Sequence, residues 1–263
     1  MSDDFIFTSE SVTTGHPDKL CDQISDAIMG RYLRQDRMAS VIAECAISTG
    51  IVFIAARVAA NASIDIPGTA RDLIMRAGYD HNGFDVRNCT VMTSITDLPV
   101  SSRRAEEELE PGDLDQLVVQ DQATVFGYAC DHTENLMPLP IWLSHKLARR
   151  ISEVRCEELL PYLAPDAKTQ VGVEFRDRRP TRIHSISIVA SQQHAGSPTE
   201  DQLRNDLIET VITPVFEAEE VKVDGKTRLF INPAGKVVGG GPSLHSGMTG
   251  RKTAVDTYGE YSR

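Results

Sequence analysis

Three short stretches of this 263-residue sequence gather side chains that could bind an anion and a divalent cation. In the first, TTGHPDKL, a Gly-Pro turn carries His16, Asp18 and Lys19 just where an apolar periodicity begins. A helix N-terminus has unpaired N–H groups and partial positive charge, so His16 and Lys19 there could hold phosphate oxygens while Asp18 holds the cation. The residues alone leave the alternative open, in which Asp18 caps the helix and His16 packs.

The second stretch is DAKTQV, where Asp166 and Lys168 alternate at the entry of an expected strand and share one face. An exposed charged turn is the plainer interpretation. In the third stretch, VVGGGPSLHSGMTGRKTAVDTYG, the glycines and Pro242 are expected to leave backbone amides free. Arg251 and Lys252 add two cations that could bind phosphate oxygens, Arg251 through its planar guanidinium and Lys252 as a point charge. Neither GxxxxGK[ST] nor GxGxxG occurs in the sequence, so no Walker A or dinucleotide-binding loop is predicted.

The elements that must position these residues follow from hydrophobic periodicity and turn signals. Helices are expected at 17–34, 69–78, 139–155 and 197–212, the last beginning with a Ser197-x-x-Glu200 capping box. Strands are expected at 40–48, 51–59, 89–95, 169–175 and 182–191. Residues 96–122 lose this periodicity and are expected to form either a mobile lid or a solvated linker. The sequence therefore predicts a mixed α+β fold.

The composition excludes several classes of function. A formal net charge of -11 argues against broad binding to nucleic acid or to an anionic membrane, because phosphate backbones are held by clustered cations. The five cysteines are scattered and form no CxxC pair, which indicates reduced thiols rather than a zinc site or a disulfide framework. No stretch is apolar enough to span a bilayer. We expect a cytoplasmic protein with no nucleic-acid or membrane partner.

Five ordered motifs connect the three stretches: FTSESVTTGHPDKLCDQISDAI, FGYACDHTENLMPLPIWLSHKLARR, LPYLAPDAKTQV, FINPAGKVVGGGP and GMTGRKTAVDTYG. On these motifs the chain resembles the S-adenosylmethionine synthetase (methionine adenosyltransferase) family, from about Phe5 to the last residue. That family joins the sulfur of methionine to C5′ of ATP, expels the triphosphate and hydrolyses it to pyrophosphate and phosphate. The resemblance implies an ATP-dependent adenosyltransferase that forms S-adenosylmethionine and requires Mg²⁺ and K⁺.

The resemblance also implies roles for single residues. The residues expected to take part in catalysis are His16, Lys168 and Arg251. The residues expected to contact the nucleotide or its phosphates are His16, Asp121, Asp166, Lys168, Lys236, Val237, Arg251 and Lys252. Asp18 would bind Mg²⁺ and Glu44 would help to hold K⁺.

The chain departs from the family where the family binds the amino acid. Arg57 replaces the Glu of a GGE motif, Leu98 replaces a Gln, and His245 replaces an Asp. Val237 stands for an aromatic residue, and VVQDQA replaces GAGDQG around Asp121. Like charges about 4 Å apart repel by roughly 4 kcal/mol at an effective dielectric of 20, so methionine should bind poorly in the usual pose. Two alternatives follow: a different thioether or acid-bearing nucleophile, or a catalytically inactive nucleotide-binding paralogue.

The implied architecture is a set of pseudo-threefold related α+β domains with flat mixed sheets. Residues 1–13 with 132–235 would form the N-terminal domain, and 14–110 with 236–263 the central domain. Residues 111–131 would belong to a C-terminal domain that is otherwise largely missing. Flat sheets would pair two subunits, so a homodimer or tetramer with active sites at the subunit interface is expected.

Overall fold

The computed structural model describes residues 4–79, 84–99, 124–193 and 196–261, which form an α+β fold built on two mixed sheets. The strands are β1 (Phe5–Val12), β2 (Ser40–Ser48), β3 (Ile51–Ala59), β4 (Thr90–Asp97), β5 (Leu163–Arg176), β6 (Arg179–Gln192), β7 (Arg228–Ile231) and β8 (Gly247–Met248). The helices are α1 (Pro17–Gln35), α2 (Ile66–Arg76), α3 (Leu139–Cys156), α4 (Glu200–Leu207), α5 (Thr213–Glu217) and α6 (Thr253–Asp256). The predicted fold class is confirmed.

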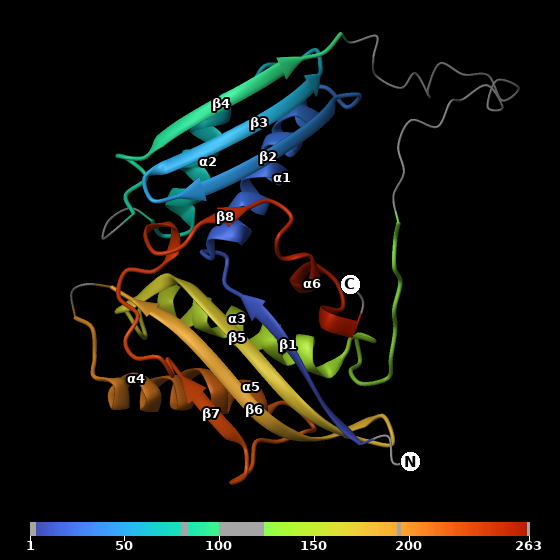
Figure 1. The fold of residues 1–263 in the computed structure, drawn as a ribbon, viewed down its shortest axis with the longest axis vertical. Coiled ribbons are helices and arrows are strands. Elements are labelled where there is room, and N and C mark those ends of the chain that lie inside the picture. Colours follow the sequence, from blue (N-terminus) through green and yellow to red (C-terminus); the bar gives the residue numbers. More distant parts are fainter. Residues whose placement is uncertain (1–3, 80–83, 100–123, 194–195, 262–263) are drawn as a thin grey trace, which may run out of the picture.

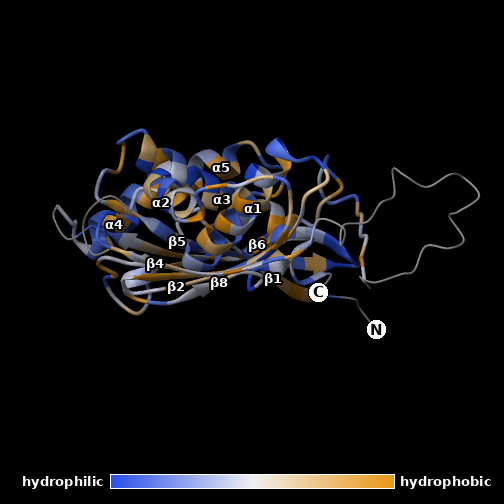
Figure 2. Ribbon diagram, turned by 90° about the horizontal axis from the view of Figure 1, so that it is seen from above, coloured by the Kyte–Doolittle hydropathy of each residue, from blue (hydrophilic) through white to orange (hydrophobic). Residues whose placement is uncertain are grey.

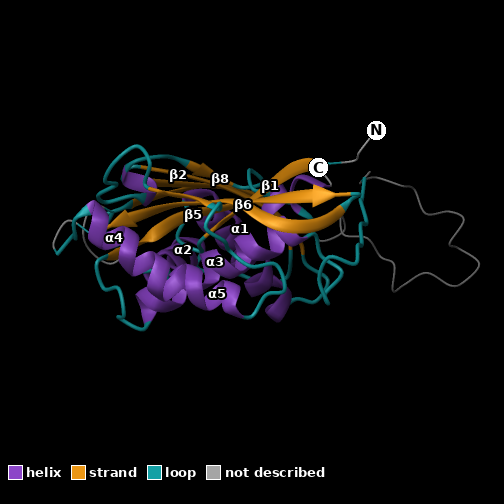
Figure 3. Ribbon diagram, turned by 90° about the horizontal axis from the view of Figure 1, so that it is seen from below, coloured by secondary structure: helices purple, strands orange, loops and turns teal. Residues whose placement is uncertain are grey.

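The two sheets lie one above the other in Figure 1, with β8 and α6 in the region where they meet. The first has the strand order β1-β5-β6-β7 and the second β4-β3-β2-β8. Seen along the perpendicular direction in Figures 2 and 3, both sheets form one layer and the larger helices form the other. Each sheet therefore has one face covered by helices and one open face.

The first sheet is antiparallel between β1, β5 and β6 and parallel between β6 and β7. Its covered face packs against α3, whose residues Leu143 and Leu147 are fully buried together with Val171 and Val173 of β5. These residues recur at helical spacing in α3 and at every second position in β5, which is the pattern that both elements need to share one core.

The second sheet contains the predicted hairpin of β2 and β3, with β4 parallel to β3 and β8 antiparallel to β2. Helices α1 and α2 supply its core, including the fully buried Ile24 and Ile28. Along β3, Val52 and Ile54 are buried while Ile51 and Phe53 are exposed. The strand therefore shows one face to the helices and the other to solvent.

The predicted starts of two helices, α2 and α4, are wrong. The capping box at Ser197 does not form: Thr199 is the N-cap of α4, and its side chain accepts the N–H of Gln202. The hydroxyl of Ser197 instead donates to the backbone carbonyl of Gln193. Helix α2 starts at Ile66 with Asp65 as its cap, earlier than expected. Strands β1 and β7 were not predicted.

The expectations about the cysteines, the loop after β4 and the domain boundaries have different outcomes. The cysteines at the five positions are free, as predicted, and three are buried. Most of the expected lid or linker, together with Asp121, lies outside the described residues. No helix within the described ranges is both long and apolar enough to cross a membrane. The discontinuous domain boundaries stay a prediction.

Candidate functional site

The site is built where the end of β1 meets the start of β5. The N–H of Thr13 donates to the carbonyl of Ala167 at 2.9 Å, and the Ala167 N–H donates back to Thr13 Oγ1 at 2.8 Å. A Cβ added to Gly15 would lie 2.4 Å from the Pro165 side chain, so only glycine lets the chain pass this close. The turn before α1 is thus held against β5, with His16 beside Asp166.

The Gly-rich segment between β7 and β8 approaches the same point. The N–H of Gly241, which has φ +62°, donates to Asp166 Oδ2 at 2.8 Å. A Cβ at Gly241 would lie 2.1 Å from Tyr79 Oη, and that hydroxyl donates to the carbonyl of Gly15 at 2.6 Å. Tyr79 therefore ties the two glycine segments together, and its burial raises its pKa.

His16, rather than Asp18, is the N-cap of α1. Its Nδ1 accepts the N–H of Asp18 at 3.2 Å, and the residue is 8% exposed. Burial lowers the pKa of His16 to about 4, against the opposing attraction of Asp166. The imidazole is therefore neutral at pH 7, with Nδ1 as acceptor and the proton on Nε2.

Asp18 is buried and surrounded by donors from the last of the three stretches. Its Oδ1 accepts the Met248 N–H at 3.0 Å, and the Lys252 ammonium lies 3.0 Å from its Oδ2. The Arg251 guanidinium lies 3.7 Å from Oδ1. Burial by itself raises the pKa of this carboxyl, but Lys252 and Met248 outweigh it and hold the pKa below its usual value.

A second group of charges extends this contact along α1. Lys19 lies 3.1 Å from Asp22 and 2.6 Å from Asp256, and the N–H of Gly250 donates to Asp22 at 2.9 Å. Burial lowers the pKa of Lys19, yet these two carboxylates raise it above its ordinary value overall. Sequence reasoning did not single out Asp22 or Asp256. The signal for Asp22 was its place four residues after Asp18, on the same helix face.

His245 completes the group from the side that faces solvent. Its Nε2 and Asp166 Oδ2 are 2.8 Å apart, and 43% of its side chain is exposed. The hydrogen bond to Asp166 raises the pKa of His245. The rings of His16 and His245 are tilted, with centroids 5.1 Å apart. The structure therefore brings His16, Asp18, Asp166, His245 and the Arg251–Lys252 pair together.

Other predicted residues of the nucleotide site lie at its edge. Lys168 follows Asp166 by two residues on β5 and pairs with Glu10 on β1. The carbonyl of Val237 accepts the N–H of Gln192 at 2.8 Å, so the residue runs alongside the end of β6. Lys236 is exposed and donates to the carbonyl of Ser197 at 3.5 Å.

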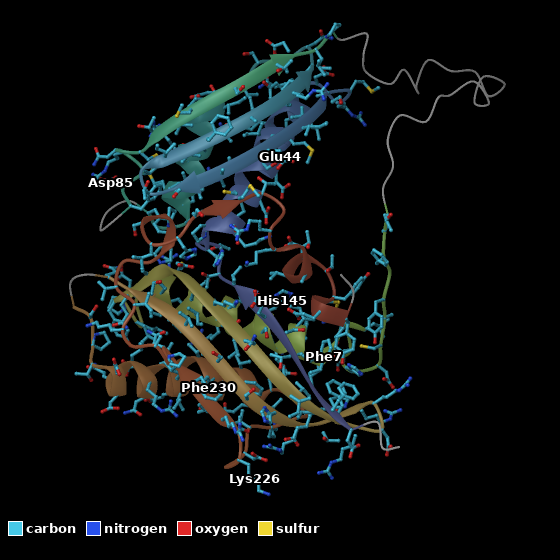
Figure 4. All side chains as sticks on the ribbon, in the orientation of Figure 1. Phe7, Glu44, Asp85, His145, Lys226 and Phe230 are labelled. Carbon is cyan, nitrogen blue, oxygen red and sulfur yellow. The ribbon has the colours of Figure 1, made fainter. Side chains whose placement is uncertain are left out.

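Three predicted residues belong to the second sheet. Glu44 on β2 and Arg57 on β3 are exposed and sit at alternate positions to the buried residues, on the face that α1 and α2 leave open. Figure 4 shows Glu44 on this sheet. Leu98 is half-buried just after β4, where its N–H donates to the carbonyl of Val58 at 2.7 Å. No described contact joins these residues to His16.

The arrangement suits an extended anion. The N-terminus of α1, a neutral imidazole donor and two cations near one carboxylate lie close together, whereas the N–H groups of Gly241 and Gly250 already donate to Asp166 and Asp22. A family model described as "S-adenosylmethionine synthetase, N-terminal domain" matches residues 4–99, and one described as "S-adenosylmethionine synthetase, central domain" matches residues 116–237. The two matches span most of the chain, and they include His16, Asp18 and Asp166, whereas the segment that carries His245, Arg251 and Lys252 follows the second match. The chain belongs to the S-adenosylmethionine synthetase family.

Proposed function

We propose that this protein is an ATP-dependent adenosyltransferase that forms S-adenosylmethionine from ATP and L-methionine. The sulfur of methionine attacks C5′ of ATP, the C5′–O bond breaks, and the triphosphate leaves with the bonding electron pair. Sulfur is already a strong nucleophile, so the protein has mainly to align the reactants and stabilise the leaving anion. The observation that carries the proposal is the convergence of His16, Lys252 and Arg251 around Asp18.

His16 is suited to the oxygen that leaves C5′. Because Nδ1 accepts the Asp18 N–H, the distal Nε2–H is free to donate to an oxygen on which negative charge develops. A low pKa keeps this donor neutral at pH 7, so its role is to donate a hydrogen bond rather than to add a full charge. Its rotation is restrained by the cap bond, which prepares the donor before substrate binds.

Lys252 and Arg251 lie near the Asp18 carboxylate and could bind the polyphosphate of the substrate in its place. In the protein alone both lie near the Asp18 carboxylate, at 3.0 and 3.7 Å. A polyphosphate carries more negative charge than one carboxylate, and Arg251 is half-exposed, so both cations can turn towards it. Lys168, paired with Glu10 at the edge of the group, would add a third cation.

Asp18 fits a Mg²⁺ ion that it shares with phosphate. Mg²⁺ is commonly held by one or two carboxylates together with substrate phosphates and water, and Asp18 offers one buried carboxylate beside the proposed phosphate path. When bound, the ion would neutralise charge on the leaving group. Glu44 presents a second carboxylate, exposed on β2, for which we propose a role in holding K⁺.

The assay that tests this proposal incubates the protein with ATP, methionine, Mg²⁺ and K⁺ and detects the sulfonium product by mass spectrometry, with released phosphate measured in parallel. His16→Asn is the informative variant, because asparagine keeps an N-cap acceptor for Asp18 N–H but lacks the distal donor. We expect kcat to fall by roughly 10²- to 10³-fold. ATP binding without any sulfonium product would instead support the inactive paralogue.

A second candidate is the same reaction on a different thioether. The observation that favours it is the bond between His245 and Asp166, which raises the pKa of His245 and favours a cation in the site. A cation there disfavours the ammonium group of methionine. A panel of thioethers with and without an ammonium group, compared by kcat/KM, separates the two candidates. Methionine as the preferred substrate would dismiss the second one.

We also propose that a second copy of the chain covers the open face of the second sheet. This face carries exposed apolar side chains on three strands and β8: Ile42, Ile51, Phe53, Met92 and Met248. Exposed apolar patches of this kind mark interaction surfaces. Arg57 and Glu44 lie on the same face, so the amino-acid site would be completed at the subunit interface of a homodimer or a tetramer.

The proposed setting is the cytoplasm. The cysteines are free, which suits a reducing compartment. The acidic net charge of -11 disfavours nucleic acid as a partner, and ATP must therefore be held by the local cluster of cations rather than by the overall field.

A further inference from the structure

His16, Asp166 and His245 form a cluster with the chemistry of a transition-metal site. Each offers one ligand atom, and the three atoms all lie within 4.8 Å of one another. They come from three separate segments: the turn before α1, strand β5 and the loop before β8. Two imidazoles and one carboxylate on one side of an ion are the donor set of many Zn²⁺ and Fe²⁺ sites, whereas Mg²⁺ prefers oxygen ligands alone.

In the structure, a hydrogen bond joins two members of this cluster, His245 and Asp166. Nε2 of His245 and Oδ2 of Asp166 are 2.8 Å apart, which is a hydrogen bond. Bonds of about 2.0 to 2.2 Å to a tetrahedral ion put neighbouring donor atoms about 3 to 3.5 Å apart, so an ion can replace that proton with little movement. Within the described residues both donors to Asp166 bond to Oδ2, which leaves Oδ1 open to a ligand.

Since the three ligand atoms lie within 4.8 Å of one another, His16 has to approach by at most about 1.3 to 1.8 Å to join the set. Its Nδ1 takes the weak cap bond from Asp18 N–H at 3.2 Å, so Nε2 is the nitrogen left for an ion. If Nε2 binds the ion, its proton moves to Nδ1 and the cap bond from Asp18 N–H is lost; Asp18 Oδ2, now 3.9 Å from Nδ1, would then have to move closer to accept that proton. A carboxylate behind a ligating histidine in this way is the usual support of metal-binding imidazoles.

The neighbouring backbone fixes two of the ligands and leaves the third adjustable. Gly241 N–H holds Asp166, and the contact of Gly15 with Pro165 holds the turn that carries His16. His245 is the most exposed of the three and sits on a loop, so it can close over an ion. Three protein ligands leave coordination positions for water, an amine or a phosphate oxygen.

We propose that His16, Asp166 and His245 bind one divalent transition-metal ion of the kind that prefers imidazole, such as Zn²⁺ or Co²⁺. This site is separate in its chemistry from the Mg²⁺ held by Asp18 and phosphate in the proposed function. It requires His245, one of the residues at which the resemblance implies a departure from the family pattern. The inference rests on the three side chains and not on the reaction, and the two roles of His16 exclude each other: Nε2 that binds an ion cannot donate a hydrogen bond to the leaving oxygen.

The experiment titrates Co²⁺ into chelator-treated protein without a histidine tag and follows the visible absorption of the ion, with Zn²⁺ competition as confirmation. His245→Gln keeps a side-chain N–H for Asp166 but removes the imidazole, and we expect affinity for Co²⁺ to fall at least tenfold. His184→Gln is the matched control, because His184 is a partly buried histidine on β6 whose ring bonds only to Ser185 among the described hydrogen bonds. It should bind as the wild type does.

The outcomes are distinguishable from those of the activity assay. One Co²⁺ per chain, with the loss confined to His245→Gln, supports the site whether or not a sulfonium product forms. Wild-type protein that binds no Co²⁺, or a His245→Gln variant that binds it equally well, overturns the inference even if the protein is an active adenosyltransferase. Thermal melting of both variants confirms that the fold is retained.

Discussion

At the scale of single residues, the site depends on burying an imidazole beside several charges. His16 has a folded pKa of about 4 against an ordinary value of 6.5. As pH falls from 6.5 towards 4 the unfolded chain therefore binds a proton before the folded one does, and stability falls with it. Above pH 6.5 both states are neutral and the residue contributes nothing to the pH dependence.

The first prediction follows from this loss of stability at acidic pH. We expect the ring of His16 to titrate near pH 4 in an NMR experiment and to contribute a loss of up to about 3 kcal/mol of folding stability between pH 6.5 and pH 4. In His16→Asn, whose side chain does not titrate, the fall in unfolding free energy over this range should be smaller. A ring that titrates near 6.5 would contradict the burial argument.

Asp18 leads to a second residue-scale prediction. Its depressed pKa means that it stabilises the fold above its unfolded pKa of about 3.9 and loses that contribution as pH falls through the lower, folded value. Lys252→Gln removes the ammonium 3.0 Å away and should lessen the depression. Denaturant unfolding at pH 5 and pH 3 should show a smaller difference for Lys252→Gln than for wild type. An equal difference would show that Lys252 does not set this pKa.

At the scale of elements, the close contact between β8 and the start of α1 decides where Asp18 meets the Gly-rich segment. A Cβ added to Gly247 would lie 2.1 Å from the carbonyl carbon of Pro17 and 2.5 Å from Asp18 N. No side chain can occupy that space without moving backbone. The contact holds Met248 N–H on the Asp18 carboxylate.

The third prediction compares two glycines. Gly247→Ala should destabilise the protein by about 1 to 3 kcal/mol, since overpacking forces β8 away from α1. Gly30, inside α1, would carry a Cβ with nothing within 4 Å, so Gly30→Ala should stabilise by about 0.5 to 1 kcal/mol through helix propensity. Thermal or urea unfolding measures both. Similar effects from the two changes would refute the packing argument.

The elements also show how far the sequence alone could be interpreted. Helices α1 and α3 and the β2–β3 hairpin were predictable, because their periodicities are long and uninterrupted. Strand β1 was missed because FIFTSESV turns from apolar to polar along its length, and its partner β5 lies more than 150 residues away. The short β7 gives no periodic signal. Both Ser197 and Thr199 could cap helix α4, and the choice of Thr199 depends on local backbone geometry that the sequence motif does not reveal.

At the scale of the whole molecule, the open sheet face gives the fourth prediction. Phe53→Asp places a carboxylate at the centre of the proposed subunit interface, where burying it unpaired costs several kcal/mol. We expect the dissociation constant of the oligomer to rise at least about 100-fold. Met75→Asp is the control, because Met75 is also exposed but lies on α2, in the helix layer. Analytical ultracentrifugation measures both.

An oligomer that survives Phe53→Asp, or that Met75→Asp dissolves equally, would place the interface elsewhere. A chain that is a monomer before any substitution would remove the basis for a shared site. In either case the cluster around Asp18 would remain intact, because all of its described contacts lie within one chain.

The meeting of distant segments could not be derived from residue spacing. His16 and Asp166 become neighbours only because Gly15 fits against Pro165 and Thr13 bonds to Ala167, contacts between segments about 150 residues apart. The resemblance to a family indicated which residues belong to the site. The residue types in each short stretch indicated that they could bind an anion and a metal ion. The bond of His245 to Asp166 was not foreseen, since His245 was considered only as a change in the amino-acid pocket.

The central claim is that these segments form one site for a polyphosphate, and binding of tripolyphosphate tests it most directly. Isothermal titration in the presence of Mg²⁺ should show one saturable site per chain. The double variant Arg251→Gln, Lys252→Gln should bind roughly 100-fold or more weakly, since each charge-assisted contact contributes about 1.5 to 3 kcal/mol. Lys226→Gln, an exposed lysine at the far end of the first sheet in Figure 4, should bind as the wild type does. Equal binding by the folded double variant, or no binding by the wild type, would contradict the account.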